Sequence, residues 1–177
     1  MLGRSRRKVA AAAAQRLYEA IMARARTPLF HEKFGVADTI DGRFDLLVLH
    51  LYLVLERLAS EGPGGAELAK ATTVVTFAGF EEALRQLGVS DSGMSRRIKA
   101  MANAFYGRLE AYGNAAGDPS QLTQALLRNL YRADHTREIE ASRLAHYVIA
   151  ARRQLTLPGM AATLLTGTVD FGPLPAE

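Results

Sequence analysis

The sequence predicts an all-α fold, a single-domain helical bundle of six or seven helices. Apolar residues recur at steps of three and four along most of the chain, and short breaker stretches separate these segments. Strand character is confined to residues 72–76 and 166–171, which is too little for a sheet. A chain of 177 residues suits one domain with one core, so the helices must bury their apolar faces against one another.

Capping residues and breakers define the first three helices. The first should cover about residues 5–26 and stop before Pro28. The second should end at the glycine-rich stretch 62–65, which we interpret as a hinge or linker because no Gly-Lys-Ser/Thr follows it. The third should span residues 66–87. The residues whose oxygens can cap the second helix are Asp38, Thr39 and Asp41.

The second half of the chain shows three more helices. The fourth begins after Ser90 or Asp91 and carries one clean apolar stripe. Asp118 followed by proline predicts the start of the fifth, with a capping carboxylate and then proline at the first helical position. The sixth covers residues 137–155. Residues 1–177 thus form one domain. Within it, we expect residues 1–8 to be a flexible basic end, and residues 158–177 to be a short helical turn with an extended tail.

The second helix is apolar on all of its faces. Its sequence reads FDLLVLHLYLVLERL, and a helix of this kind must be buried on every side or must cover its spare face with a partner. We expect a central core helix, with the alternative that one face lines a groove for an apolar segment of another protein. The apolar run is about half the length that a membrane-spanning helix needs.

Charge and composition narrow the partners. The net charge is +4, mostly from arginine, which favours an anionic partner such as phospholipid headgroups, nucleic acid or an acidic protein face. A GC-rich genome would produce the same excess. Cysteine is absent, which excludes disulfides and thiolate metal sites. The candidates for contact with an anionic surface are the basic residues at the start of the chain, Arg4, Arg6, Arg7 and Lys8.

Signals of catalysis are missing from the sequence. The histidines lack metal-ligand spacing, and no serine lies in a nucleophile elbow. His50 lies among leucines, and we interpret it as a core histidine with satisfied hydrogen bonds. We therefore predict no catalytic residue, no metal site and no cofactor, and a protein that is not an enzyme.

Residues 83–101 offer an alternative function, a helix-turn-helix regulator that binds DNA. Gly88 would form the turn, and Arg96 and Arg97 would meet the duplex. Against this, Leu84 stands where close helix crossing requires a small residue. The second helix also continues as a long core element, so we expect no specific DNA partner.

Two stretches carry a resemblance to a known family. DTIDGRFDLLVLHLYLVLERL (38–58) and LGVSDSGMSRRIKAMANAFYGRLEAY (87–112) are similar to the ubiquinol–cytochrome c chaperone family, and the likeness extends over about residues 17–155. The resemblance implies an alphaproteobacterial relative of the mitochondrial complex III assembly factors. It implies a chaperone that binds newly made cytochrome b and supports complex III assembly, in the cytoplasm and peripheral to the inner membrane. An anionic membrane surface or the ribosome is a further expected partner.

The resemblance also supplies candidate client-binding residues. The segment AFYGRLEAY is its most specific piece. Glycine within a helix costs about 1 kcal/mol against alanine, so we expect close approach by another helix or by the client at Gly107. Helix capping and helix-start electrostatics would also explain the acidic and basic residues at the start of the second helix. The full set of candidates is Phe105, Tyr106, Gly107, Arg108, Tyr112, Asp41, Arg43 and Asp45.

Overall fold

Six long helices account for most of the computed structural model, which describes residues 2–174 and the side chains of residues 8–174. No strand occurs among these residues, and the predicted all-α bundle is confirmed. The short helices α2 (Leu29–Glu32) and α8 (Met160–Leu165) and a 3₁₀ turn (His135–Arg137) complete the described part of the chain. The long helices are α1 (Leu2–Ala25), α3 (Ile40–Ala59), α4 (Gly62–Gln86), α5 (Asp91–Ala115), α6 (Pro119–Asn129) and α7 (Glu138–Leu155).

Helix α3 lies at the centre of the bundle. It packs against α1, α4, α5, α7 and α8, and every residue from Asp45 to Val54 is buried. The apolar character on all of its faces thus finds partners on all sides, as the central-helix interpretation expects. Each fully buried leucine or valine contributes about 1.5–3 kcal/mol relative to an exposed one. No helix in the described part of the chain is long and apolar enough to cross a membrane.

Two predicted caps are present. The Thr39 hydroxyl accepts a hydrogen bond from the Gly42 amide at the start of α3, at 3.1 Å. The Asp118 carboxylate accepts from the Ser120 and Gln121 amides at the start of α6, at 2.8 and 3.2 Å. Each side chain satisfies amides that have no carbonyl partner within the helix, which is worth about 1 kcal/mol.

The glycine-rich stretch is not a linker, and that prediction is wrong. Gly62 to Gly65 form the first turn of α4, with Pro63 at a position where a helix needs no amide donor. Gly65 packs directly against the end of α3, because a Cβ atom there would lie 2.1 Å from the Leu58 carbonyl oxygen. The glycines therefore permit a tight α3–α4 junction rather than a flexible one.

The β-branched stretch within the third predicted helix is helical, as expected. The Thr72 hydroxyl donates to the Leu68 carbonyl oxygen at 2.8 Å, and the Thr76 hydroxyl donates to that of Thr72 at 2.9 Å. Both side chains are fully buried. Internal hydrogen bonds thus allow two polar groups to lie inside the helix packing.

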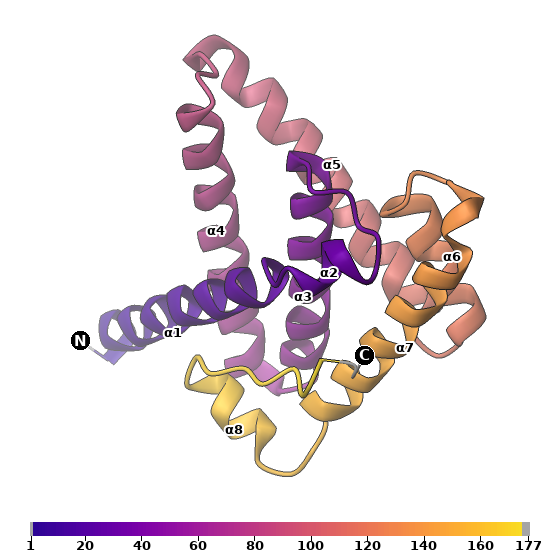
Figure 1. Ribbon diagram of the computed structural model, residues 1–177. Coiled ribbons are helices and arrows are strands. Elements are labelled where there is room, and N and C mark those ends of the chain that lie inside the picture. Colours follow the sequence, from indigo (N-terminus) through magenta and orange to yellow (C-terminus); the bar gives the residue numbers. More distant parts are fainter. Residues whose placement is uncertain (1, 175–177) are drawn as a thin grey trace.

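Helices α4 and α5 form a long hairpin, and the first turn of α3 lies between its two arms (Figure 1). Gly88 makes the turn in the left-handed region, at φ +78°. Each arm has 25 residues, and the apolar stripe of α5 enters the core through Phe105 and Tyr112, both fully buried. The exposed start of α5 continues without a break into the core, so α5 is a long core element, as expected, rather than a separate recognition helix.

The described residues towards each end of the chain lie in a helix or pack on the core. Helix α1 begins at Leu2 and so includes residues 2–8, the expected flexible end. The side chains of Arg4, Arg6 and Arg7 lie outside the described residues, and that of Lys8 is exposed. The tail is extended after α8, and Phe171 anchors it in the core.

His50 is a buried neutral side chain with both ring nitrogens satisfied, as the sequence predicts. Its Nδ1 donates to the Leu46 carbonyl oxygen at 2.7 Å, and its Nε2 accepts from the Tyr147 hydroxyl at 2.9 Å. That hydroxyl in turn accepts from Arg24 Nε, at 2.9 Å. Phe171 covers the ring edge-on, with centroids 5.2 Å apart. Burial lowers the pKa of His50 to about 4, so the imidazole stays uncharged in the folded state.

His50 predicts an acid-dependent loss of stability. Its ordinary pKa is 6.5, so between about pH 6.5 and pH 4 the unfolded chain binds a proton that the folded chain does not. The free energy of unfolding should therefore fall by at most about 3 kcal/mol through this window. Urea unfolding of the wild type and of His50→Gln at several pH values measures it, because the difference between the profiles cancels the carboxyl groups that both share.

The exposed His146, also on a helix, provides the control. His146→Gln should keep the wild-type pH profile. Parallel profiles for the wild type and His50→Gln would show that the buried imidazole does not resist protonation, contrary to the assignment.

Candidate functional site

A buried ion-pair cluster joins the two sequence stretches that carry the family resemblance. Asp45 on α3 is fully buried. Its Oδ1 lies 2.7 Å from Arg108 Nε on α5, and its Oδ2 lies 2.9 Å from a terminal nitrogen of Arg132, in the loop after α6. Burial raises the pKa of Asp45 to about 6, against the opposing effect of the two guanidiniums. The carboxylate is therefore ionised at neutral pH, and both ion pairs are formed.

Arg108 contacts other groups besides the Asp45 carboxylate. It donates to the Ala104 carbonyl oxygen at 3.1 Å, and its guanidinium lies over the Phe44 ring at 5.3 Å. Its side chain is only 13% exposed. Arg108 lies off the apolar stripe of α5, which indicated a side chain free for contact with a client. In the structure Arg108 is largely buried and neutralises a buried charge, and its contact with a client stays a prediction.

The other candidates on α5 divide into buried and exposed residues. Phe105 and Tyr112 are fully buried, and the Tyr112 hydroxyl has no hydrogen-bond partner among the described residues. Burial, and secondly the nearby Asp45 carboxylate, raise the pKa of Tyr112. Tyr106 is 57% exposed, with its ring stacked on Phe77 at 6.5 Å. A Cβ atom on Gly107 would meet nothing within 4 Å, so no neighbouring helix approaches closely there.

The candidates at the start of α3 have separate roles. Asp41 is exposed and lies 3.7 Å from Arg132. Arg43 is exposed and pairs with Asp38 at 2.7 Å. The capping interpretation fails for Asp45, because Thr39 is the cap and Asp45 points into the core. Helix-start electrostatics are a sufficient account of Asp41, and the ion pair with Asp38 is a sufficient account of Arg43.

Next to this cluster lies a groove of about 630 Å³, formed by the start of α3, the end of α4, residues 96–108 of α5 and Arg132 in the loop after α6. We call it the arginine-rimmed groove. Its apolar lining consists of Ile40, Phe44, Leu84, Ala100, Met101 and Ala104. Its charged lining consists of Asp41, Arg96, Arg97, Arg108 and Arg132.

A smaller apolar pocket of about 280 Å³ adjoins the groove. The two hollows share Ile40, Phe44 and Met101, and the pocket extends from there to α1. Ile40 is 66% exposed and Leu87, which also lines the pocket, is 58% exposed. Sequence reasoning named Arg96 and Arg97 only for DNA contact. It missed Ile40 and Arg132, because the surface they share forms only when α3, α4, α5 and the loop after α6 come together.

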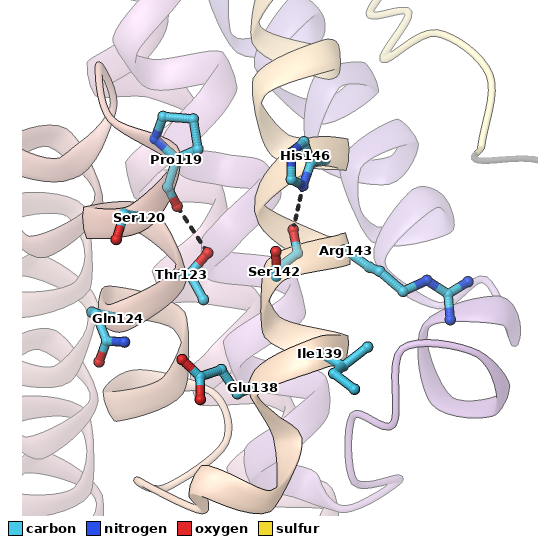
Figure 2. Close-up of a pocket in the computed structure, with 9 residues that line it drawn as sticks. All are labelled: Pro119, Ser120, Thr123, Gln124, Glu138, Ile139, Ser142, Arg143 and His146. Carbon is cyan, nitrogen blue, oxygen red and sulfur yellow. Dashed lines mark hydrogen bonds between the residues drawn. The ribbon is translucent and has the colours of Figure 1, made fainter.

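A third hollow, of about 560 Å³, lies between α6 and α7 and is polar (Figure 2). Its Thr123 hydroxyl donates to the Pro119 carbonyl oxygen, and His146 Nδ1 bonds to that of Ser142, so these groups use hydrogen bonds within their own helices. Arg143 points away from α6 in Figure 2. Thr123 and His146 are therefore occupied within their own helices, and the hollow lies outside the stretches 38–58 and 87–112 that carry the resemblance.

The ion-pair cluster predicts a large stability effect from one change. Asp45→Ala leaves the Arg108 guanidinium buried without a counter-charge, and we expect a loss of about 3 kcal/mol in the free energy of unfolding. Arg132→Ala removes a partner that is 49% exposed and should cost about 1 kcal/mol or less. Urea unfolding of Asp45→Ala, Arg108→Ala and Arg132→Ala measures the single effects. The double variant Asp45→Ala/Arg108→Ala completes a double-mutant cycle with the first two and gives their coupling.

Arg43→Ala is the matched control, because it breaks an exposed ion pair of the same 2.7 Å length. It should leave the unfolding free energy close to that of the wild type, because solvent screens this pair. Equal losses for Asp45→Ala and Arg43→Ala would contradict the role of the cluster.

Comparisons with known proteins agree with the resemblance seen in the sequence. The family model described as ubiquinol-cytochrome C chaperone matches residues 32–169. The chain is 29% identical to ubiquinol-cytochrome-c reductase complex assembly factor 1 of Xenopus laevis, over 92% of this chain and 82% of that protein. The mouse assembly factor 1 is 26% identical, and the match covers 92% of this chain but only 55% of the mouse protein.

A solved structure shares the whole fold. The crystal structure of the Cbp3 homolog from Brucella abortus matches with a TM-score of 0.84 and 36% sequence identity, over 97% of this chain and 95% of that one. The family match includes α3, α4 and α5, which line the arginine-rimmed groove, and also Arg132. On this evidence the chain belongs to the ubiquinol–cytochrome c chaperone family.

Proposed function

We propose that this protein is an assembly chaperone for ubiquinol–cytochrome c reductase that binds newly made cytochrome b in the arginine-rimmed groove and its adjoining apolar pocket. The observation that carries the proposal is the exposed apolar lining of these hollows. Ile40 and Leu87 stand more than half exposed beside Phe44 and Met101, whereas α3 is buried from Asp45 to Val54. Family membership gives the assembly role, and the groove gives a place for the client.

A membrane subunit needs such a surface before it is assembled. Helices that will cross a bilayer expose apolar side chains that water does not solvate well, so they aggregate unless another apolar surface covers them. A groove between helices can receive one face of a client helix. Met101 at the junction of the two hollows is suited to this, because an unbranched, polarisable side chain adapts to different partners.

The proposed place of action is the cytoplasmic side of the inner membrane, where the client inserts. The start of α1 carries Arg4, Arg6, Arg7 and Lys8, and each basic residue near an anionic bilayer gains about 1 kcal/mol. The same charges suit the ribosome as the source of the client. This part of the proposal is supported by charge alone.

Ile40→Asp tests the groove in cells. Ile40 is 66% exposed and occupies the first position of α3, where a carboxylate is favourable, so the variant should fold with normal stability. It places a charge on the apolar lining, which should oppose the docking of an apolar helix. In a strain that lacks the gene, the variant should restore well under half of the wild-type amount of assembled cytochrome b, measured by haem spectra of membranes and immunoblotting.

Ile139→Asp is the matched control. Ile139 is 75% exposed and lies in the first turn of α7. It lines neither the arginine-rimmed groove nor the adjoining apolar pocket. This variant should restore cytochrome b fully. Full restoration by Ile40→Asp would contradict client binding in the groove. A normal amount of cytochrome b in the deletion strain would contradict the assembly function itself.

A further inference from the structure

The cations of the arginine-rimmed groove are of two kinds. Arg108 and Arg132 pair with the buried Asp45 carboxylate. Arg96 and Arg97 are exposed, and neither has an ion pair with another described residue. Two guanidiniums at the rim therefore have donors to offer to an anionic partner.

Arg132 is held at the rim by a strained backbone. It and Ala133 have φ values of +55° and +60°, in the left-handed region that residues other than glycine seldom adopt. Such conformations are unfavourable for residues with a side chain and cluster at functional sites. The Arg132 side chain is 49% exposed and also reaches the buried Asp45. The loop therefore maintains a cation above the groove although a relaxed backbone would be more stable.

The rim and the lining alternate along one ridge of α5. Arg96, Ala100, Ala104 and Arg108 follow at four-residue steps, and all four line the groove. The two arginines stand about 18 Å apart along the helix axis, with only methyl side chains between them. Small side chains on a ridge let the backbone of a second helix approach closely. A distance of this length corresponds to about three turns of a partner helix, which is more than one lipid headgroup occupies.

We infer that the arginine-rimmed groove selects a client helix with an apolar middle and carboxylates on its flanks. This inference rests on the proposed function and adds the chemistry of the segment that is recognised. The flanking carboxylates would meet Arg96, Arg97 and Arg132, and the apolar middle would lie on Ala100, Ala104 and Phe44. Arg108 stays with Asp45 beneath the groove. Asp41 is the one acid among the described residues that line the groove, and it would repel basic flanks if Arg132 were drawn away from it.

The test uses the full chain and three synthetic helical peptides of equal length. They share one leucine–alanine face and carry glutamate, glutamine or lysine at the flanks. Fluorescence anisotropy at low salt should rank them in that order of affinity. Arg96→Gln/Arg97→Gln should weaken binding of the glutamate peptide by roughly fivefold to tenfold and leave the glutamine peptide unchanged, since each exposed ion pair is worth up to about 1 kcal/mol. Added salt should reduce the same preference.

Arg128→Gln is the matched control, because Arg128 is an exposed arginine on α6 that does not line the groove. It should bind all three peptides as the wild type does. Equal affinity for glutamate and lysine flanks would overturn the inference. So would phosphatidylglycerol vesicles that displace the glutamate peptide and lose binding in Arg96→Gln/Arg97→Gln, since the site would then be a lipid site.

Capture of cytochrome b by the same variants separates this inference from the proposed function. If the wild type and Arg96→Gln/Arg97→Gln cross-link nascent cytochrome b equally well, the inference fails and the proposed function stands. If the wild type captures no cytochrome b, the proposed function fails, whatever the peptides show.

Discussion

One buried carboxylate organises the side of the molecule that carries the groove. Asp45 is the only acid in the buried part of α3, and a lone charge in that position would be strongly destabilising. Two guanidiniums from different parts of the chain neutralise it, one from α5 and one from the loop after α6. The same three segments supply the rim and much of the lining of the groove. The geometry of the binding surface is thus fixed by the charge balance behind it.

This arrangement separates the parts of the protein that hold the fold from those that face a partner. Arg108 is occupied by Asp45 and by the Phe44 ring, so it supports the groove from beneath. The exposed Arg96 and Arg97 are not required by any described contact. The exposed arginines beside the apolar hollow also discourage two copies of the chain from associating through it, since the arginines of the two copies would repel each other. Exposed apolar surface is then available to a client at a lower risk of self-association.

Local signals predicted most of the fold, and tertiary contacts explain what they missed. Thr39 and Asp118 begin helices because their side chains cap free amides, a rule that operates within four residues. His50 was recognisable as a core residue from its leucine neighbours. The prediction of a linker at residues 62–65 failed, because a glycine-rich sequence does not reveal that Gly65 packs against the Leu58 carbonyl oxygen. Asp45, Arg108 and Arg132 are far apart in the sequence, so their meeting had no local signal, although two of the three stood among the candidates.

The position of α3 has a consequence for the synthesis of this protein. The ribosome makes α3, the most apolar helix, before it makes α7 and the tail residue Phe171, which pack around His50. During translation, α3 can pack first only on α1, and then on α4 and α5 as these emerge. During its synthesis this chain therefore passes through a stage at which its most apolar helix is exposed to water. A membrane subunit that is not yet assembled has the same exposed apolar surface.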